Sequence, residues 1–151
     1  MNDLLPVLQD SALATAMRTG PWAYPLVETV HLVAIATVFG TVLIVDLRVL
    51  GLGIRVAPAP LAAFALRINL AGFALAAVTG ALLFASHAVD VAASIAFQFK
   101  LQLLIFLALN AAVFHLRGSL MRRDLLARLQ AIGSIAGWIG VIAAGRLIAD
   151  A

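Results

Sequence analysis

Residues 26–50, LVETVHLVAIATVFGTVLIVDLRVL, decide the fold of this chain. The stretch exceeds the roughly 20 residues that cross the hydrocarbon core of a bilayer, and Glu28, Asp46 and Arg48 are its only formally charged side chains. A β-strand is not expected here, because the apolar run is continuous and much longer than a strand. The stretch therefore predicts a transmembrane α-helix.

Three further apolar runs follow, at residues 61–85, 95–116 and 129–148, and each is again close to the length of a membrane span. The segment before the first span, residues 1–23, mixes polar and apolar residues and predicts a short helix that lies in the membrane interface. The sequence thus predicts an all-α fold, an integral membrane four-helix bundle with a short N-terminal interfacial helix. The whole chain, residues 1–151, is expected to form a single membrane domain.

The composition excludes several classes of protein. Hydrophobic residues make up 64% of the chain and charged residues 11%, whereas a soluble domain carries about 25% charged residues. The absence of cysteine excludes disulfides, thiolate metal sites, covalently attached c-type haem and iron–sulfur clusters. The net charge of +3 does not indicate nucleic-acid binding, because the arginines lie at the ends of the apolar runs. The expected partner is the lipid bilayer.

Basic residues indicate how the spans are oriented. Seven of the ten flank two of the three connections, residues 48–67 and 117–128. They are Arg48, Arg55, Arg67, Arg117, Arg122, Arg123 and Arg128. With an even number of spans these connections lie on one side, and the positive-inside rule assigns that side to the cytoplasm. We therefore expect a multi-pass protein of a bacterial inner (plasma) membrane with both termini in the periplasm.

Ionisable side chains inside the first span need a partner or a function, because a charge in lipid is costly. At ~100° per residue, Glu28 and Asp46 occupy the same angular position on the helix, and His31 lies ~60° away. All three are expected to face the bundle interior, Glu28 and His31 near the periplasm and Asp46 near the cytoplasm. Glu28 and Asp46 are interpreted as structural polar groups.

The three histidines are the candidate ligands for haem iron or a metal ion. His31 can ligate haem iron, bind copper or zinc, or relay protons, or it can simply hydrogen-bond Glu28 or a neighbouring helix. His87 follows the second span near the same membrane face, so it can clamp a b-type haem with His31, although a solvated interfacial histidine is the plainer interpretation. His115 is expected roughly 10–15 Å from His31 along the membrane normal, at ~1.5 Å per residue, and its default partner is Asp46.

Three further polar residues lie in the spans. Lys100 can extend to the headgroups, or it can hold a haem propionate or a quinone oxygen. Asn110 and Arg48 are interpreted as structural polar groups, Asn110 through a hydrogen bond between helices. Gly133 and Gly137 form a small-x-x-x-small pattern, which packs the fourth span within the bundle or against a second subunit.

Five phrases stand out when they are taken together. They are Tyr24–Leu32 (YPLVETVHL), Asp46–Gly51 (DLRVLG), Thr79–Phe84 (TGALLF), Ala96–Lys100 (AFQFK) and Asn110–His115 (NAAVFH). The combination resembles an uncharacterised family of small bacterial four-helix inner-membrane proteins, known as a domain of unknown function, over about residues 22–117.

The resemblance matches most of the polar positions discussed above. They are Glu28, His31, Asp46, Arg48, Lys100, Asn110 and His115. His87 is not matched. A looser likeness to CopD-type copper-resistance proteins and to small b-type cytochromes rests on histidines carried by membrane helices.

The favoured hypothesis is a membrane-embedded, b-type haem-binding electron-transfer subunit, in a homo-oligomer or with other membrane subunits, without bond-making catalysis. His31 is one axial ligand in this hypothesis, and the second is His87, His115 or a residue of another chain. One alternative is a cofactor-free structural or assembly subunit of a membrane complex. The other is a metal-ion or proton transporter, although three methionines and no cysteine leave few soft ligands for copper(I).

Overall fold

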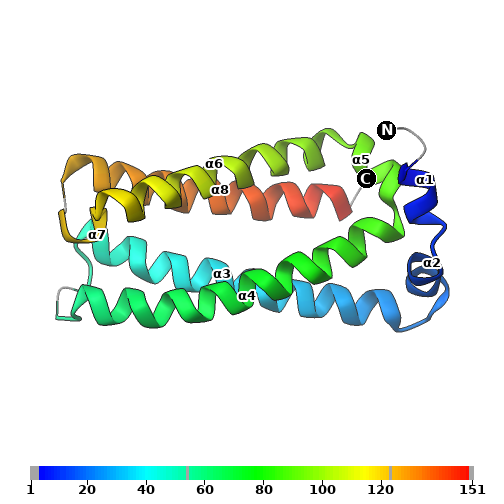
Figure 1. Ribbon diagram of the computed structural model, residues 1–151, viewed down its shortest axis with the longest axis horizontal. Coiled ribbons are helices and arrows are strands. Elements are labelled where there is room, and N and C mark those ends of the chain that lie inside the picture. The colour runs from blue at the N-terminus through cyan, green and yellow to red at the C-terminus, as the bar shows by residue number, and fades with distance from the viewer. Residues whose placement is uncertain (1–3, 54, 123, 150–151) are drawn as a thin grey trace.

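A computed structural model describes residues 4–53, 55–122 and 124–149, and within them it contains helices and no strand. The four long helices are α3 (Ala23–Leu50), α4 (Pro58–Ser86), α6 (Ile95–Arg117) and α8 (Leu125–Ala149). They form two pairs, α3 with α4 and α6 with α8, and α3 also packs against α8 (Figure 1). Each is long and apolar enough to cross a membrane. The prediction of an all-α membrane bundle is confirmed.

Large apolar side chains cover the outside of the bundle, while its inside is built from small residues. Leu32, Phe64 and Leu109 expose 60%, 67% and 63% of their surface. The buried apolar residues are mostly alanine and valine, such as Ala34 and Val38. In lipid, hiding a large apolar side chain gains little, whereas small residues let helix backbones approach closely. This distribution suits a bundle whose outer surface contacts hydrocarbon.

Glycines of α8 fit against leucines of α6. A Cβ atom added at Gly137 would lie 2.8 Å from Cδ2 of Leu107, and one at Gly140 would lie 2.9 Å from Cδ1 of Leu103. Gly133 is looser, because its added Cβ would lie 3.5 Å from Cζ of Phe106. The glycine pattern therefore packs α8 within the bundle.

Three of the long helices begin earlier than the sequence predicts, and α3 starts at Ala23 rather than near residue 26. α4 starts at Pro58 rather than near residue 61, because a proline fits the first helical turn, where its missing N–H is not needed. α8 starts at Leu125 rather than near residue 129, because Oδ1 of Asp124 accepts the N–H of Ala127 at 2.8 Å and caps the helix.

Short helices close both ends of the bundle. α1 (Leu4–Gln9), α2 (Ala12–Thr19) and α5 (Ala88–Ala93) lie at one end, the α5 end, and α7 (Ser119–Arg122) lies at the other, the α7 end (Figure 1). The sequence predicts one interfacial helix before the first span, and the structure has two. The break arises because Oγ of Ser11 accepts the N–H of Ala14 at 3.3 Å and starts a new helix.

An arginine fastens these short helices to the bundle. Nη1 of Arg18 donates to the backbone oxygens of Gln9 at 2.6 Å and of Ser86 at 2.9 Å. The Ser86 oxygen belongs to the last turn of α4, where carbonyl groups have no partner within the helix. Arg18 thereby joins α1 and α2 to the end of α4.

Candidate functional site

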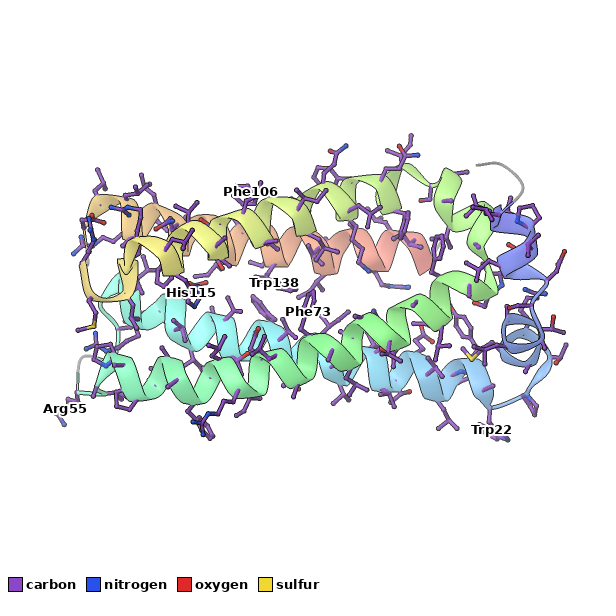
Figure 2. The ribbon with its side chains drawn as sticks, viewed as in Figure 1. Trp22, Arg55, Phe73, Phe106, His115 and Trp138 are labelled. Carbon is purple, nitrogen blue, oxygen red and sulfur yellow. The ribbon has the colours of Figure 1, made fainter. Side chains whose placement is uncertain are left out.

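A cavity of about 730 Å³ separates the α3–α4 pair from the α6–α8 pair toward the α7 end. All four long helices contribute to its wall. Figure 2 shows His115, Trp138 and Phe73 in the space between the two pairs, and all three line the cavity. Phe73 is 51% exposed, so the α4 side of the wall is open to the surroundings. The polar residues of the wall are Thr41, Asp46, Asn69, Asn110, His115, Gln130 and Ser134.

Asp46 is the most deeply buried ionisable group in this wall. It is only 6% exposed, and Ser134 hydrogen-bonds its carboxyl group. Its Oδ2 atom has no hydrogen-bond partner among the residues that the structure describes. Arg48 lies on the opposite side of α3, where its Nε donates to the backbone oxygen of Val56 at 2.8 Å. Asp46 therefore presents a carboxyl oxygen that a ligand or a proton can bind.

His115 is oriented by its own helix. Its Nδ1 lies 2.8 Å from the backbone oxygen of Ala111. Because a carbonyl only accepts, Nδ1 carries the proton and Nε2 keeps a lone pair. Proteins commonly orient metal-ligating histidines in this way. The sequence predicts Asp46 as the partner of His115. Asp46 lines the same cavity, but Nδ1 of His115 forms its hydrogen bond with Ala111.

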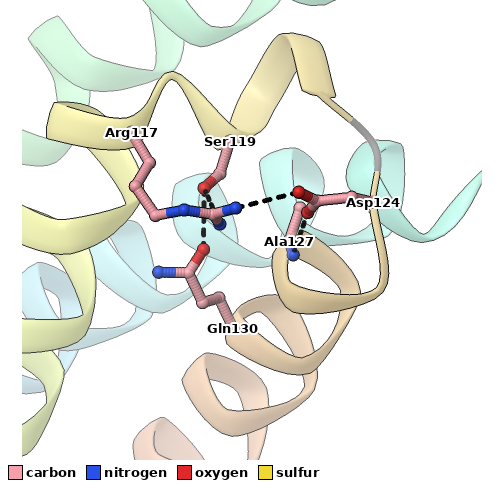
Figure 3. Close-up of polar contacts among 5 residues, drawn as sticks. All are labelled: Arg117, Ser119, Asp124, Ala127 and Gln130. Carbon is pink, nitrogen blue, oxygen red and sulfur yellow. Dashed lines mark hydrogen bonds and ion pairs between the residues drawn. The ribbon is translucent and has the colours of Figure 1, made fainter.

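Asn110 belongs to a set of hydrogen bonds that joins α6, α7 and α8. Its Nδ2 donates to the backbone oxygen of Gln130 at 3.0 Å, and Oγ of Ser119 donates to Oε1 of Gln130 at 2.8 Å. Arg117 donates to Oγ of Ser119 at 3.1 Å and forms an ion pair with Asp124 at 2.8 Å (Figure 3). Ser119 and Gln130 are buried. The network thus fixes the α7 end of the cavity.

His31 lies in the other half of the bundle and bridges α3 and α4. Its Nδ1 is 2.9 Å from Oγ1 of Thr79, whose hydroxyl donates to the backbone oxygen of Leu75 at 2.7 Å. Oγ1 of Thr79 therefore accepts from Nδ1, and the ring also forms a hydrogen bond with the backbone of Ala76. Gly80 makes room for the ring, since a Cβ there would lie 3.0 Å from Cε1 of His31. Glu28, one turn away on α3, is partly exposed.

Lys100 of α6 extends into the same half of the bundle. Its Nζ atom lies 3.5 Å from the position of a Cβ added at Gly145 of α8. Across the described part of the chain, Lys100 forms no hydrogen bond and no ion pair. It does not line the 730 Å³ cavity.

The three histidines are spread along the bundle. His87, at the α4–α5 junction, is exposed, and its ring meets the Tyr24 ring edge-on at 5.9 Å between centroids. Tyr24 and His31 are two turns, roughly 10 Å, apart along the axis of α3. His115 lies in the opposite half. Among the described residues, no three histidine, aspartate or glutamate side chains gather where they could hold a metal ion.

Sequence reasoning gave no role to several residues that shape these sites. Thr79 is the hydrogen-bond partner of His31, and Gln130, Ser134 and Trp138 line the cavity. The sequence does contain a signal for Gln130, Ser134 and Trp138, because a spacing of four residues places them on one face of α8. Thr79 gives a weaker signal, since threonine is common in membrane helices and bonds its own backbone there.

Comparison with known proteins identifies one family. The model of a family of unknown function, DUF6644, matches residues 15–151. The match includes the fourth span, which lies beyond the region 22–117 of the resemblance described above. No curated protein and no solved structure matches the chain.

Proposed function

The chain belongs to the DUF6644 family of unknown function, and we propose from its own geometry that it is a b-type haem-binding electron-transfer subunit. The observation that carries the proposal is the combination of His115 and the cavity. The histidine offers Nε2, with Nδ1 held by Ala111, in the wall of a space of about 730 Å³. That volume is within the roughly 300–1,000 Å³ of pockets that enclose small ligands and cofactors.

The wall suits the chemistry of haem. Haem binds in apolar slots between helices and needs one or two axial ligands, of which imidazole is the commonest. Phe73, Trp138 and Leu107 supply apolar surface, and His115 supplies the imidazole. Met121 lines the same cavity, and a thioether is the second haem ligand in cytochromes c. When bound, haem supplies an iron that changes its oxidation state by one electron.

The protein is assigned three tasks in this proposal. His115 would bind the iron, and the Ala111 carbonyl keeps it in one orientation. The apolar side chains of the wall would contact the haem ring. The network around Gln130 and Ser119 holds α6 against α8, which keeps His115 and Trp138 in the same wall. A second copy or another membrane subunit is the electron partner. The loose likeness to CopD-type proteins and small b-type cytochromes is part of this proposal.

We place the protein in a bacterial inner membrane with the α7 end toward the cytoplasm. Arg55, Arg117 and Arg122 lie at or near that end, and positive charge favours the cytoplasmic side. The cavity then lies in the cytoplasmic half of the bilayer, and His31, Lys100 and His87 lie in the periplasmic half.

An absorption spectrum of the purified protein tests the proposal. We expect a Soret band, α and β bands that sharpen on reduction with dithionite, and a pyridine haemochrome of the b type near one haem per chain. Expression in a host with sufficient haem excludes a shortage of cofactor. A protein that is folded by circular dichroism and lacks both signals contradicts the proposal.

The unpartnered oxygen of Asp46 favours one other function, proton transport. A buried carboxyl group in a membrane can accept a proton from one side and release it to the other, and His31 and Glu28 lie along the same helix toward the α5 end. Proteoliposomes loaded with a pH-sensitive dye test this function. Proton flux that is lost in Asp46→Asn, in protein without haem, supports it, and flux no greater than in empty liposomes contradicts it.

A further inference from the structure

One face of α6 is exposed along the whole length of the helix. The structure describes every residue of α6, and among them Leu107 alone is buried. A stripe of exposed residues, here called the α6 seam, follows spacings of three and four residues in alternation. Its members are Ile95, Gln98, Gln102, Ile105, Leu109, Ala112 and Leu116. This spacing is the a/d repeat by which two parallel helices pack along each other.

Gln102 is the member of the α6 seam that requires a partner. It lies seven residues after the first residue of α6, roughly 10 Å along the axis of a helix that is long and apolar enough to cross a membrane. Its side chain is exposed, and its amide forms no hydrogen bond with the residues that the structure describes. Hydrocarbon offers no hydrogen-bonding group, so an amide left alone there is costly. The position of Gln102 therefore indicates a hydrogen-bonding group from outside the chain.

A second exposed polar residue at a similar depth shows the contrast. Thr29 lies six residues after the first residue of α3, and its side chain is also exposed. Its hydroxyl donates to the backbone oxygen of Pro25 at 2.7 Å, so its own helix satisfies it. The amide of Gln102 has no such internal solution.

We propose that the α6 seam is the interface of a parallel homodimer, in which the Gln102 amides of two copies hydrogen-bond each other. All copies of one chain insert in the same orientation, so their α6 helices run parallel and equal residues lie at equal depth. A primary amide carries both donors and an acceptor, so two facing amides satisfy each other. This self-complementarity favours a second copy over a different subunit. The proposal does not depend on haem.

The rest of the α6 seam fits a second copy. Ile105 and Leu109, which follow Gln102 along the seam, are 62% and 63% exposed and offer apolar surface for packing. Gln98 lies one turn nearer the end of the helix, and its Nε2 already donates to the backbone oxygen of Ala92 at 3.4 Å. The glycines of α8 pack against α6 within the bundle, so the second copy meets a different face. The seam thus combines one polar contact with apolar packing, as membrane helix interfaces do.

Association of the full chain in liposomes tests the proposal. Energy transfer between donor-labelled and acceptor-labelled copies, measured as lipid is added, gives the dissociation constant of the dimer. We expect the native chain to dimerise, and Gln102→Leu, which keeps the bulk without the amide, to weaken dimerisation about tenfold. Gln102→Asn keeps an amide and should dimerise more tightly than Gln102→Leu. Thr29→Val, which removes the exposed hydroxyl at a similar depth, is the matched control and should dimerise like the native chain.

Cysteine crosslinking in native membranes locates the interface, because the chain has no cysteine of its own. Leu109→Cys, on the α6 seam, should form a disulfide-linked dimer on oxidation. Leu32→Cys, at a position 60% exposed on α3, should remain monomeric. A native chain that stays monomeric in liposomes, equal dimerisation of Gln102→Leu and the native chain, or a Leu109→Cys variant that forms no dimer or crosslinks only to a different protein overturns the proposal.

Discussion

Nδ1 of His31 and Oγ1 of Thr79 lie 2.9 Å apart, and this hydrogen bond joins α3 to α4 inside the membrane. Thr79 is only 6% exposed, so water does not replace the bond when it is broken. Thr79→Val keeps the shape of the side chain and removes the oxygen. We expect a loss of about 0.5–1.5 kcal/mol of stability, because the part-buried ring loses one hydrogen bond and keeps the one to the backbone of Ala76. Thermal unfolding in detergent measures it.

Thr79→Ser is the matched control, because it keeps the hydroxyl and should retain most of the stability. If Thr79→Val and Thr79→Ser unfold at the same temperature as the native chain, the bond does not stabilise the pair of helices.

The contact between Gly137 and Leu107 predicts a steric effect. A Cβ at Gly137 would lie 2.8 Å from Cδ2 of Leu107, which is itself buried. Gly137→Val should therefore force α8 away from α6 and cost about 1–3 kcal/mol of stability. Gly40→Val on α3 is the control, since nothing lies within 4 Å of a Cβ added there. Similar unfolding temperatures for the two variants would argue against this helix contact.

Asp124 makes the α7 end sensitive to acid. The N–H of Ala127 and then the Arg117 guanidinium hold the pKa of its carboxyl below the ordinary 3.8. A depressed pKa means that the ionised carboxylate stabilises the fold above pH 3.8 and that this contribution disappears as the pH falls through the lowered pKa. Asp124→Ala should thus be less stable than the native chain at neutral pH, and the difference should shrink in acid.

Unfolding midpoints of both proteins across that pH range test this expectation. Arg117→Gln removes the ion pair and keeps the bond to Ala127. Its difference in stability from the native chain should therefore also shrink in acid, and at neutral pH it should be smaller than that of Asp124→Ala. A difference between Asp124→Ala and the native chain that stays constant from neutral pH into acid would rule out the mechanism.

The orientation in the membrane is testable because the chain has no cysteine. Ala57→Cys, in the exposed α3–α4 connection, and Ala93→Cys, at the exposed end of α5, change no charge. In intact spheroplasts, a membrane-impermeant maleimide should label Ala93→Cys, and it should label Ala57→Cys only after lysis. The reverse pattern would place the α7 end in the periplasm.

The sequence predicted the spans well because length and hydropathy alone determine them. It missed the true starts of α3, α4 and α8. Pro58 and the cap of Asp124 extend α4 and α8 into apparent connections. It could not predict the cavity. A membrane helix is apolar on every face, so periodicity does not show which helices pair, and the pairing decides that His115 shares a wall with Trp138.

The histidines illustrate the same limit. Their positions along the spans were known from the sequence, which put His31 and His87 near one membrane face. Two turns of α3 nevertheless separate their contacts, because His87 meets Tyr24 and His31 meets Thr79.

The Soret absorbance of three histidine variants, prepared side by side with the native chain, tests the central claim most directly. His115→Ala should lose the haem, because it removes the imidazole from the cavity wall, whereas His31→Ala and His87→Ala should keep it at the native ratio of haem to protein. Full haem content in His115→Ala, or its loss in His31→Ala or His87→Ala alone, would contradict the assignment of haem to the cavity.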